Sequence, residues 1–228
     1  MRLPFTVLLL ACALPGCAAE LPPIVRGLAT VHLQAGGGPL TVTLQKRDLN
    51  IYEGADELVA DLYDPHRVLV GTVTIPDDGQ AGKGPADRRE YQTATVTDPT
   101  PRPGIHLLQV RAPTSQDMVW GLTTSAGKYM VQGWQTLNNP DTPATIQFQP
   151  PASAFKITMS SLHQPGRQTV ALKDAGGGTL HTFDLGELGV DQIHELPADA
   201  QRRGWWSLDI AKPDVKLAVE KGRRLDRR

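Results

Sequence analysis

Short alternating segments separated by turn residues are the feature that most constrains the fold of this chain. In the segment Leu40–Gln45 (LTVTLQ), apolar and polar side chains alternate, which is the period-two pattern of a strand with one buried face. The 228 residues include 22 Gly and 19 Pro, which interrupt the chain too often for long helices. One helical turn is expected at Pro197–Arg203, with Pro at its start and Gly204 after its end. The pattern predicts an all-β protein.

The alternating segments form two sets, separated by the unpatterned stretch Gln135–Pro143 (QTLNNPDTP), which reads as a linker. The first set is expected at Leu28–Gln34, Leu40–Gln45, Glu57–Tyr63, Arg67–Ile75, Glu90–Thr97, Gly104–Ala112, Met118–Thr124 and Tyr129–Trp134. The second is expected at Ala144–Gln149, Ala154–Ser160, Gln168–Lys173, Thr179–Leu185, Trp205–Ile210 and Val215–Glu220. We therefore predict two tandem antiparallel β-sandwich domains of jelly-roll or immunoglobulin-like type, over residues 28–134 and 144–220. A signal peptide (1–16) and a tether (17–27) precede them, the linker is 135–143, and a charged tail (221–228) follows.

The two sets resemble each other, which indicates a duplicated module. Three pairs of segments match in the same order: Leu40–Leu44 with Phe155–Met159, Leu62–Asp64 with Leu172–Asp174, and Gly104–Pro113 (GIHLLQVRAP) with Gly204–Pro213 (GWWSLDIAKP). The distance between matched segments is far too long for a solenoid repeat.

A strand that ends in Asp before a turn, followed later by Gly-x-aromatic-x-Leu-x-Ile, resembles bacterial extracellular β-sandwich modules of the pre-peptidase C-terminal type. Such modules accompany secreted enzymes and surface proteins, often as accessory or glycan-binding parts. The resemblance covers about half of each predicted domain and includes no catalytic motif. The first domain has Ile105 and His106 where such modules often have an aromatic residue.

The N-terminus reads as an export signal, with Arg2 before the apolar run Leu3–Leu14. The tetrapeptide that ends at Cys17 (LPGC) resembles a bacterial lipobox, which implies lipidation of Cys17 and anchoring to the membrane of the cell envelope. The alternative is cleavage after Ala19 and a periplasmic or secreted protein. Cys12 and Cys17 are the only cysteines, so neither route leaves an internal disulfide, a thiol nucleophile or a cysteine metal site.

Aromatic side chains on strands are the most informative candidates for a binding site. Strand alternation places Trp206 in the core and Trp205 outward beside Asp209, an arrangement that suits stacking against a sugar ring; packing of Trp205 against another part of the protein is the alternative. Trp134, at the edge of the linker, is either a platform or a plug between the domains. The loop Asp77-Asp78-Gly79 has oxygen ligands for calcium but matches no defined calcium loop, so we interpret it as a solvated turn.

The composition and motifs exclude several functional classes. The net charge of −1 provides no basic field for nucleic acid. The sequence has no nucleophile elbow, P-loop or dinucleotide fingerprint, so we expect no enzyme, no cofactor and no metal. The prediction is a non-catalytic exported envelope lipoprotein that acts as a binding or accessory module, with polysaccharide as the ligand. The alternative is a structural or protein-interaction subunit of an envelope assembly, whose partner is an envelope protein.

Overall fold

The structure, a computed structural model, describes residues 9–12, 19–49, 54–79, 91–114, 117–132, 135–138, 143–163, 168–199 and 201–221. All regular elements in these ranges are strands, so the all-β prediction is confirmed. No helix in the described ranges is long and apolar enough to cross a membrane. The first strand, β1 (Leu9–Cys12), falls in the predicted signal peptide. Two compact units divide the chain: Ala11–Val131 forms the N-terminal module, and Gln132–Arg228 belongs to the C-terminal module.

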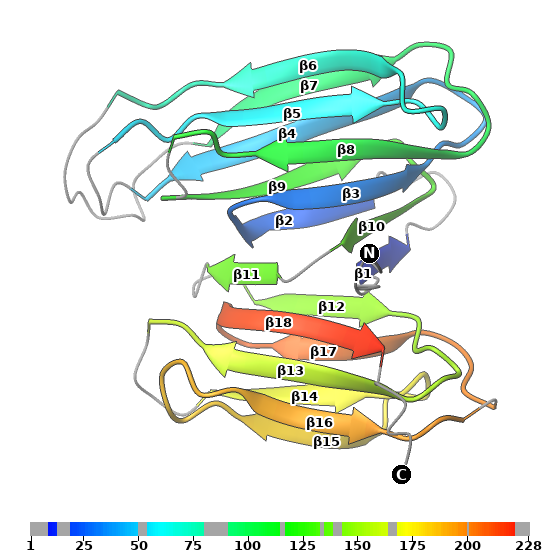
Figure 1. The fold of residues 1–228 in the computed structure, drawn as a ribbon, viewed down its shortest axis with the longest axis vertical. Coiled ribbons are helices and arrows are strands. Elements are labelled where there is room, and N and C mark those ends of the chain that lie inside the picture. The colour runs from blue at the N-terminus through cyan, green and yellow to red at the C-terminus, as the bar shows by residue number, and fades with distance from the viewer. Residues whose placement is uncertain are drawn as a thin grey trace, which may run out of the picture. The chain divides into compact units, whose positions relative to one another are not determined.

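The N-terminal module has two sheets (Figure 1). One has the order β2-β9-β4-β7, with β2 (Ala19–Arg26), β9 (Met118–Thr124), β4 (Leu40–Asp48) and β7 (Gln92–Asp98). The other has the order β10-β3-β8-β5-β6, with β10 (Lys128–Gln132), β3 (Ala29–Gln34), β8 (Ile105–Arg111), β5 (Leu58–Tyr63) and β6 (Leu69–Ile75). Neighbouring strands such as β4 and β9, or β5 and β8, run antiparallel.

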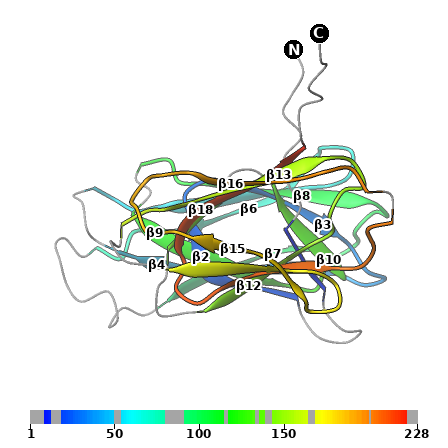
Figure 2. The same ribbon diagram turned by 90° about the horizontal axis from the view of Figure 1, so that it is seen from below.

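The C-terminal module repeats this arrangement. One sheet has the order β11-β18-β13-β16, with β11 (Gln135–Asn138), β18 (Asp214–Lys221), β13 (Phe155–Ser161) and β16 (Gln192–Leu196). The other has the order β12-β17-β14-β15, with β12 (Ala144–Phe148), β17 (Trp206–Ile210), β14 (Thr169–Lys173) and β15 (Thr179–Asp184). Figure 2 separates the layer that holds β13 and β16 from the layer that holds β12 and β15.

Strands β2 to β9 correspond in order to β11 to β18, and both sheet orders are the same in the two modules. In each of these sets of eight strands the first neighbours the eighth and the second neighbours the seventh, which is the topology of a jelly roll, and β10 is an additional strand of the N-terminal module. Two tandem sandwiches are therefore confirmed, and the jelly-roll form is the one present. The three sequence matches fall on β4 with β13, β5 with β14, and β8 with β17, so the repeat joins equivalent strands.

Each sandwich is filled by the alternate side chains that face its interior. In the N-terminal module, Val42, Leu62 and Leu108 are fully buried. In the C-terminal module, the rings of Phe148, Phe155 and Trp206 pack with centroids 6.2–6.3 Å apart. Fully burying one such side chain contributes about 1.5–3 kcal/mol, so these faces supply the stability that disulfides would otherwise add.

Two expected irregular segments contain strands. The linker range 135–143 includes β11, because buried Gln135 pairs with Leu217 and occupies a core position that its polarity conceals. The tether range 17–27 includes β2, which pairs with β9 on either side of a bulge that contains Pro22-Pro23. A Cβ on Gly121 would lie 2.3–2.6 Å from the backbone of this bulge, so only glycine fits there.

The helical turn expected at Pro197–Arg203 is wrong for the residues described there. The carboxylate of Asp199 accepts a hydrogen bond from the Gln201 N–H at 2.8 Å, and the Asp199 N–H donates to the Ala152 carbonyl at 2.9 Å. An aspartate turn tied to another loop replaces the helix, because Asp side chains compete with helical hydrogen bonds.

Candidate functional site

Each module has a sharp corner at an aspartate, as the sequence repeat indicates. The Oδ1 atom of Asp64 accepts hydrogen bonds from the backbone N–H groups two and four positions later, both at 2.8 Å. Asp174 accepts the equivalent pair at 2.9 and 2.8 Å. These bonds lower the pKa of Asp64, with the Val68 N–H as the largest cause. The backbone is left-handed at equivalent positions of the two turns, Arg67 (φ 67°) and Gly177 (φ 82°).

A glycine lies beside each aspartate turn, just before the neighbouring strand of the sheet (β8 or β17) begins. Gly104 has φ 131°, and a Cβ there would lie 3.0 Å from Pro65. Gly204 has φ 76°, and a Cβ there would lie 2.6 Å from the Cβ of Ala175. The two glycines therefore meet the residue after the aspartate in the same way. The residue after each glycine, Ile105 or Trp205, is the first of the residues that face outward along β8 or β17.

In the C-terminal module the two tryptophans lie as strand alternation predicts. Trp206 begins β17 and is 7% exposed, whereas Trp205 just before it is half-buried. Further along the same outer face, the carboxylate of Asp209 meets the Lys173 ammonium at 2.6 Å and accepts a hydrogen bond from Thr145 at 3.0 Å. Lys173 is the main reason that the pKa of Asp209 is lowered. Asp209 thus remains anionic, but its oxygens already have partners. Trp134 and Cys17 lie outside the described residues.

The N-terminal module has an aromatic side chain on the equivalent face that the sequence patterns did not single out. Strand register aligns one row across four strands: His32, Leu107, Tyr63 and Leu69. Leu107 is buried, Tyr63 is half-buried, and Leu69 is 52% exposed. The inward neighbours Leu62 and Leu108 are fully buried, which assigns this row to the outer face. We call it the Tyr63 row.

A polar row lies directly beside the Tyr63 row. Register aligns Gln109, Asp61 and Thr72 on the same face. The Asp61 carboxylate accepts hydrogen bonds from Thr72 at 2.7 Å and from Arg111 at 2.5 Å. These charge-assisted bonds fix the Asp61 carboxylate, while Gln109 is exposed and presents its amide to solvent. An aromatic and apolar strip next to anchored polar groups can bind a flat ligand that has one apolar face and several hydroxyl groups.

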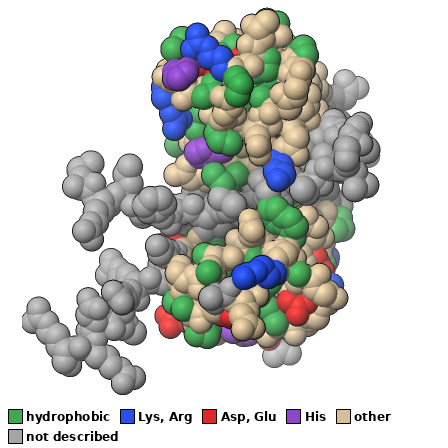
Figure 3. Space-filling model, turned by 90° about the vertical axis from the view of Figure 1, so that its right-hand side faces the viewer, with side chains coloured by type: hydrophobic (Ala, Val, Ile, Leu, Met, Phe, Trp, Pro, Cys, Tyr) green, Lys and Arg blue, Asp and Glu red, His purple; other side chains and the backbone are tan. Residues whose placement is uncertain are grey.

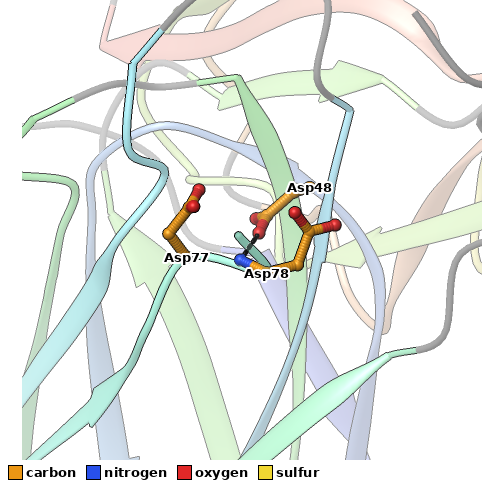
Figure 4. Close-up of side chains that lie close together, drawn as sticks. All are labelled: Asp48, Asp77 and Asp78. Carbon is orange, nitrogen blue, oxygen red and sulfur yellow. Dashed lines mark hydrogen bonds between the residues drawn. The ribbon is translucent and has the colours of Figure 1, made fainter. Parts of the chain in front are cut away.

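The turn Asp77-Asp78-Gly79, half-buried to exposed, lies at one end of the N-terminal sandwich and forms an acidic group with buried Asp48. Oxygens of Asp48, Asp77 and Asp78 lie within 4.8 Å of one another (Figure 4). The backbone N–H of Asp78 donates to Asp48 at 2.9 Å, and Asp77 accepts the N–H groups of Asp56 and Gly79 at 2.9 Å. The pKa of Asp77 is lowered, mainly by the Asp56 N–H. The loop is thus folded onto the end of β4.

Lys46 supplies the positive charge for this acidic group. Its side chain is 0% exposed, and its Nζ lies 2.7 Å from Asp48 Oδ1 and 2.9 Å from Oδ2. Nζ also donates to the Pro76 carbonyl at 2.7 Å and to the Asp56 carbonyl. The ammonium thus takes both oxygens of the Asp48 carboxylate and two backbone carbonyls as partners. A divalent ion that used Asp48 would therefore compete with Lys46.

Histidines and charges add no catalytic constellation to the described residues. Nδ1 of His163 lies 2.9 Å from Oδ1 of Asp214, and the other oxygen of this carboxylate accepts a hydrogen bond from the His163 backbone N–H at 3.0 Å. The pair therefore links the segment after β13 to the start of β18 and has a structural role. His181 of β15 and His194 of β16 stack with ring centroids 3.9 Å apart, a contact between the two sheets that sequence spacing could not show. The pKa of His194 is lowered by burial and then by His181. On the face drawn in Figure 3, charged side chains of both signs lie scattered among apolar and other groups.

No known family model matches the chain, and no curated protein is similar to it in sequence. Among solved structures, it resembles dimeric latent PorU from Porphyromonas gingivalis (10% identity, TM-score 0.30, 94% of this chain and 20% of that one). It also resembles the tandem CBM22-1-CBM22-2 domain of Paenibacillus barcinonensis Xyn10C (6%, 0.25, 95% and 89%) and tripeptidyl peptidase 2 (10%, 0.27, 96% and 22%). The chain thus spans about a fifth of PorU. Identities and scores this low say nothing about function.

Proposed function

We propose that the protein is a non-catalytic glycan-binding module of the bacterial cell envelope, exported and held at the membrane through a lipid on Cys17. The observation that carries the proposal is the Tyr63 row with its polar neighbours on the outer face of β3, β8, β5 and β6. Trp205 offers a second, smaller platform on the equivalent face of the C-terminal module.

The chemistry of the Tyr63 row suits a pyranose ring. The C–H face of a sugar is apolar and can lie on the Tyr63 ring, while exposed Leu69 extends the apolar strip. The hydroxyl groups at the ring edge can then meet Gln109 and the Asp61–Arg111 pair in the next row. Asp61 and Arg111 are already paired, so they are held in place before a ligand arrives, which reduces the entropy lost on binding.

The test is binding of immobilised polysaccharides to the whole protein and to single-residue variants. Tyr63→Ala should weaken binding by at least about tenfold, the size expected for an aromatic side chain at the centre of an interface. Tyr91→Ala is the matched control, because Tyr91 is an exposed tyrosine of the same module that lies outside the row. Tyr63→Ala should keep the melting temperature of the wild type within a few degrees. Equal affinity of both variants for the polysaccharide would refute the assignment of the site.

A second candidate function is contact with another envelope protein, and exposed apolar side chains favour it. Val68, Leu69 and Ile105 are 58%, 52% and 48% exposed, and they flank the corner at Asp64. Apolar groups that gather on a surface often mark protein interfaces. A pull-down from envelope extract that fails with Tyr63→Ala, combined with no retention on any glycan, would support this role in place of glycan binding.

A further inference from the structure

The C-terminal module has a pocket on the outer face of its other sheet, away from Trp205 and Asp209. Its volume is 560 Å³, within the range of about 300–1,000 Å³ typical of small-ligand sites. The lining residues are Thr136, Ser160, Ser161, Leu162, Gly189, Asp191 and Lys216. Most of them are polar, and they include one ammonium and one carboxylate.

The floor of the pocket is a cross-strand row. Register aligns Thr136 of β11 with Lys216 of β18, and Lys216 with Ser160 of β13. Ile157 and Met159, which alternate with Ser160 along β13, are fully buried and face the core. The row therefore belongs to the outer face, where Lys216 is exposed and Ser160 is 3% exposed.

The wall of the pocket is the segment that leads into β16. The Gly189 N–H donates to the Ser161 carbonyl at 2.9 Å, and Leu188 forms a parallel bridge with Ser161, so this segment is fixed along the edge of β13. In the β13–β16 pairing, Met159 is opposite Gln192. If that register is extended by one residue, Asp191, which directly precedes β16, is opposite Ser160, and both residues line the pocket.

This order explains why the face is hollow. The row runs Asp191, Ser160, Lys216 and Thr136, so a small serine lies between two longer charged side chains. The Cα atoms of Asp191 and Lys216 are two strand spacings apart, about 10 Å. Asp191 and Lys216 both line the pocket, together with the hydroxyl-bearing residues Thr136, Ser160 and Ser161.

We propose that this pocket binds a short zwitterionic ligand of dipeptide size, with its carboxylate on Lys216 and its amine on Asp191. A ligand with both charges pairs both side chains, whereas a ligand with one charge leaves the other side chain unpaired in the site. Two extended residues span about 7 Å, which fits the gap between side chains whose Cα atoms are about 10 Å apart. The hydroxyl groups of Ser160 and Thr136 can bond the central peptide group. The site is separate from the glycan-binding faces and does not depend on them.

The experiment is calorimetric titration of the whole protein with glycylglycine at low salt, where charge pairing is least screened. N-acetylglycylglycine lacks the amine and glycylglycinamide lacks the carboxylate, so each should bind at least about tenfold more weakly than glycylglycine. Free glycine, whose two charges are closer together, should also bind more weakly. Equal binding of the singly charged analogues, or no binding of glycylglycine at millimolar concentration, would overturn the proposal.

Variants on the same sheet face provide matched controls. Lys216→Met and Asp191→Asn should each weaken glycylglycine binding by about tenfold or more. Lys156→Met and Glu195→Gln change residues on the same outer face, where Lys156 pairs with Glu220 at 2.9 Å, and they should leave the affinity unchanged. A similar loss in the control variants would show that net charge and not the pocket binds the ligand. Tyr63→Ala should not affect this titration, so failure of the glycan proposal and failure of this one are distinguishable.

Discussion

The substitution Lys46→Met tests whether the buried ammonium holds the end of the N-terminal sandwich together. Methionine has a similar length and remains compatible with a buried position, so packing changes little. The variant loses the ion pair with Asp48 and the hydrogen bonds to the Pro76 and Asp56 carbonyls. What remains is a buried carboxylate without its cation.

The expected destabilisation is about 3–5 kcal/mol, as for other buried ion pairs that lose one partner. For a module of about 100 residues, this corresponds to a fall in melting temperature of more than about 10 °C. The double variant Lys46→Met/Asp48→Asn should be more stable than Lys46→Met alone, because the unpaired charge is gone. Equal stability of the single and double variants would show that Asp48 is not the reason for the loss.

The pH dependence has a defined sign. Burial is the largest effect on Asp48 and raises its pKa above 3.8 in the wild type, although Lys46 opposes the shift. Without Lys46, the folded-state pKa should rise further above the unfolded value, so the folded state binds more protons over that interval and loses stability as pH increases. Below the unfolded value, Asp48 is protonated in both states and this contribution is absent. The deficit of Lys46→Met relative to wild type should therefore be largest at neutral pH and shrink toward about pH 4.

Thermal or urea denaturation at neutral pH and near pH 4 would measure this dependence. A deficit that stays constant between the two pH values would refute the reasoning, since it would mean that lost packing dominates. Asp78→Asn is a useful control, because its backbone N–H, which the substitution retains, is the donor to Asp48.

Three further predictions follow from single positions. Gly204→Ala should destabilise the C-terminal module by more than about 1–2 kcal/mol in urea denaturation, since a left-handed backbone and a contact of 2.6 Å with Ala175 both oppose a Cβ; unchanged stability would contradict the contact argument. Trp206→Ala should cost about 3–5 kcal/mol and Trp205→Ala much less, because only Trp206 is in the aromatic core; equal losses would place Trp205 in a core too. Cys17→Ser should move the protein from the membrane fraction to the soluble fraction, and a wild-type protein that is soluble and without lipid by mass spectrometry would refute the lipid anchor.

Sequence patterns predicted the parts of the fold that depend on local geometry. An aspartate that caps a turn and a glycine before the neighbouring strand are both visible in the sequence. The matches of Asp64 with Asp174 and of Gly104 with Gly204 therefore identified equivalent strands. Alternation also separated buried Trp206 from half-buried Trp205. The aspartate turns and the strand alternation are local, so one chain segment contains the information needed to predict them.

The features that sequence reasoning missed depend on partners far away in the chain. β4 was expected to end at Gln45, yet it continues to Asp48, because Lys46 and Asp48 occupy core positions as a pair. A charged residue at a core position looks like a strand end unless its counterion is known. The Tyr63 row was missed for a related reason: it joins four strands, and register between strands is not visible in any one of them.

Comparison of equivalent positions shows that the two modules share buried core positions and differ on their outer faces. Leu62 and Leu172 remain fully buried in equivalent strands, whereas their outward neighbours are Tyr63 and Lys173. Along the neighbouring strands of the sheet, β8 and β17, Leu107 and Gln109 correspond to Ser207 and Asp209. Lys173 thus stands where the N-terminal module has Tyr63, and it pairs with Asp209, which stands where that module has Gln109. A ligand that stacks on the Tyr63 row would have to desolvate the Lys173–Asp209 ion pair to bind the equivalent face of the C-terminal module in the same way. One ligand would therefore not bind the two faces equally well.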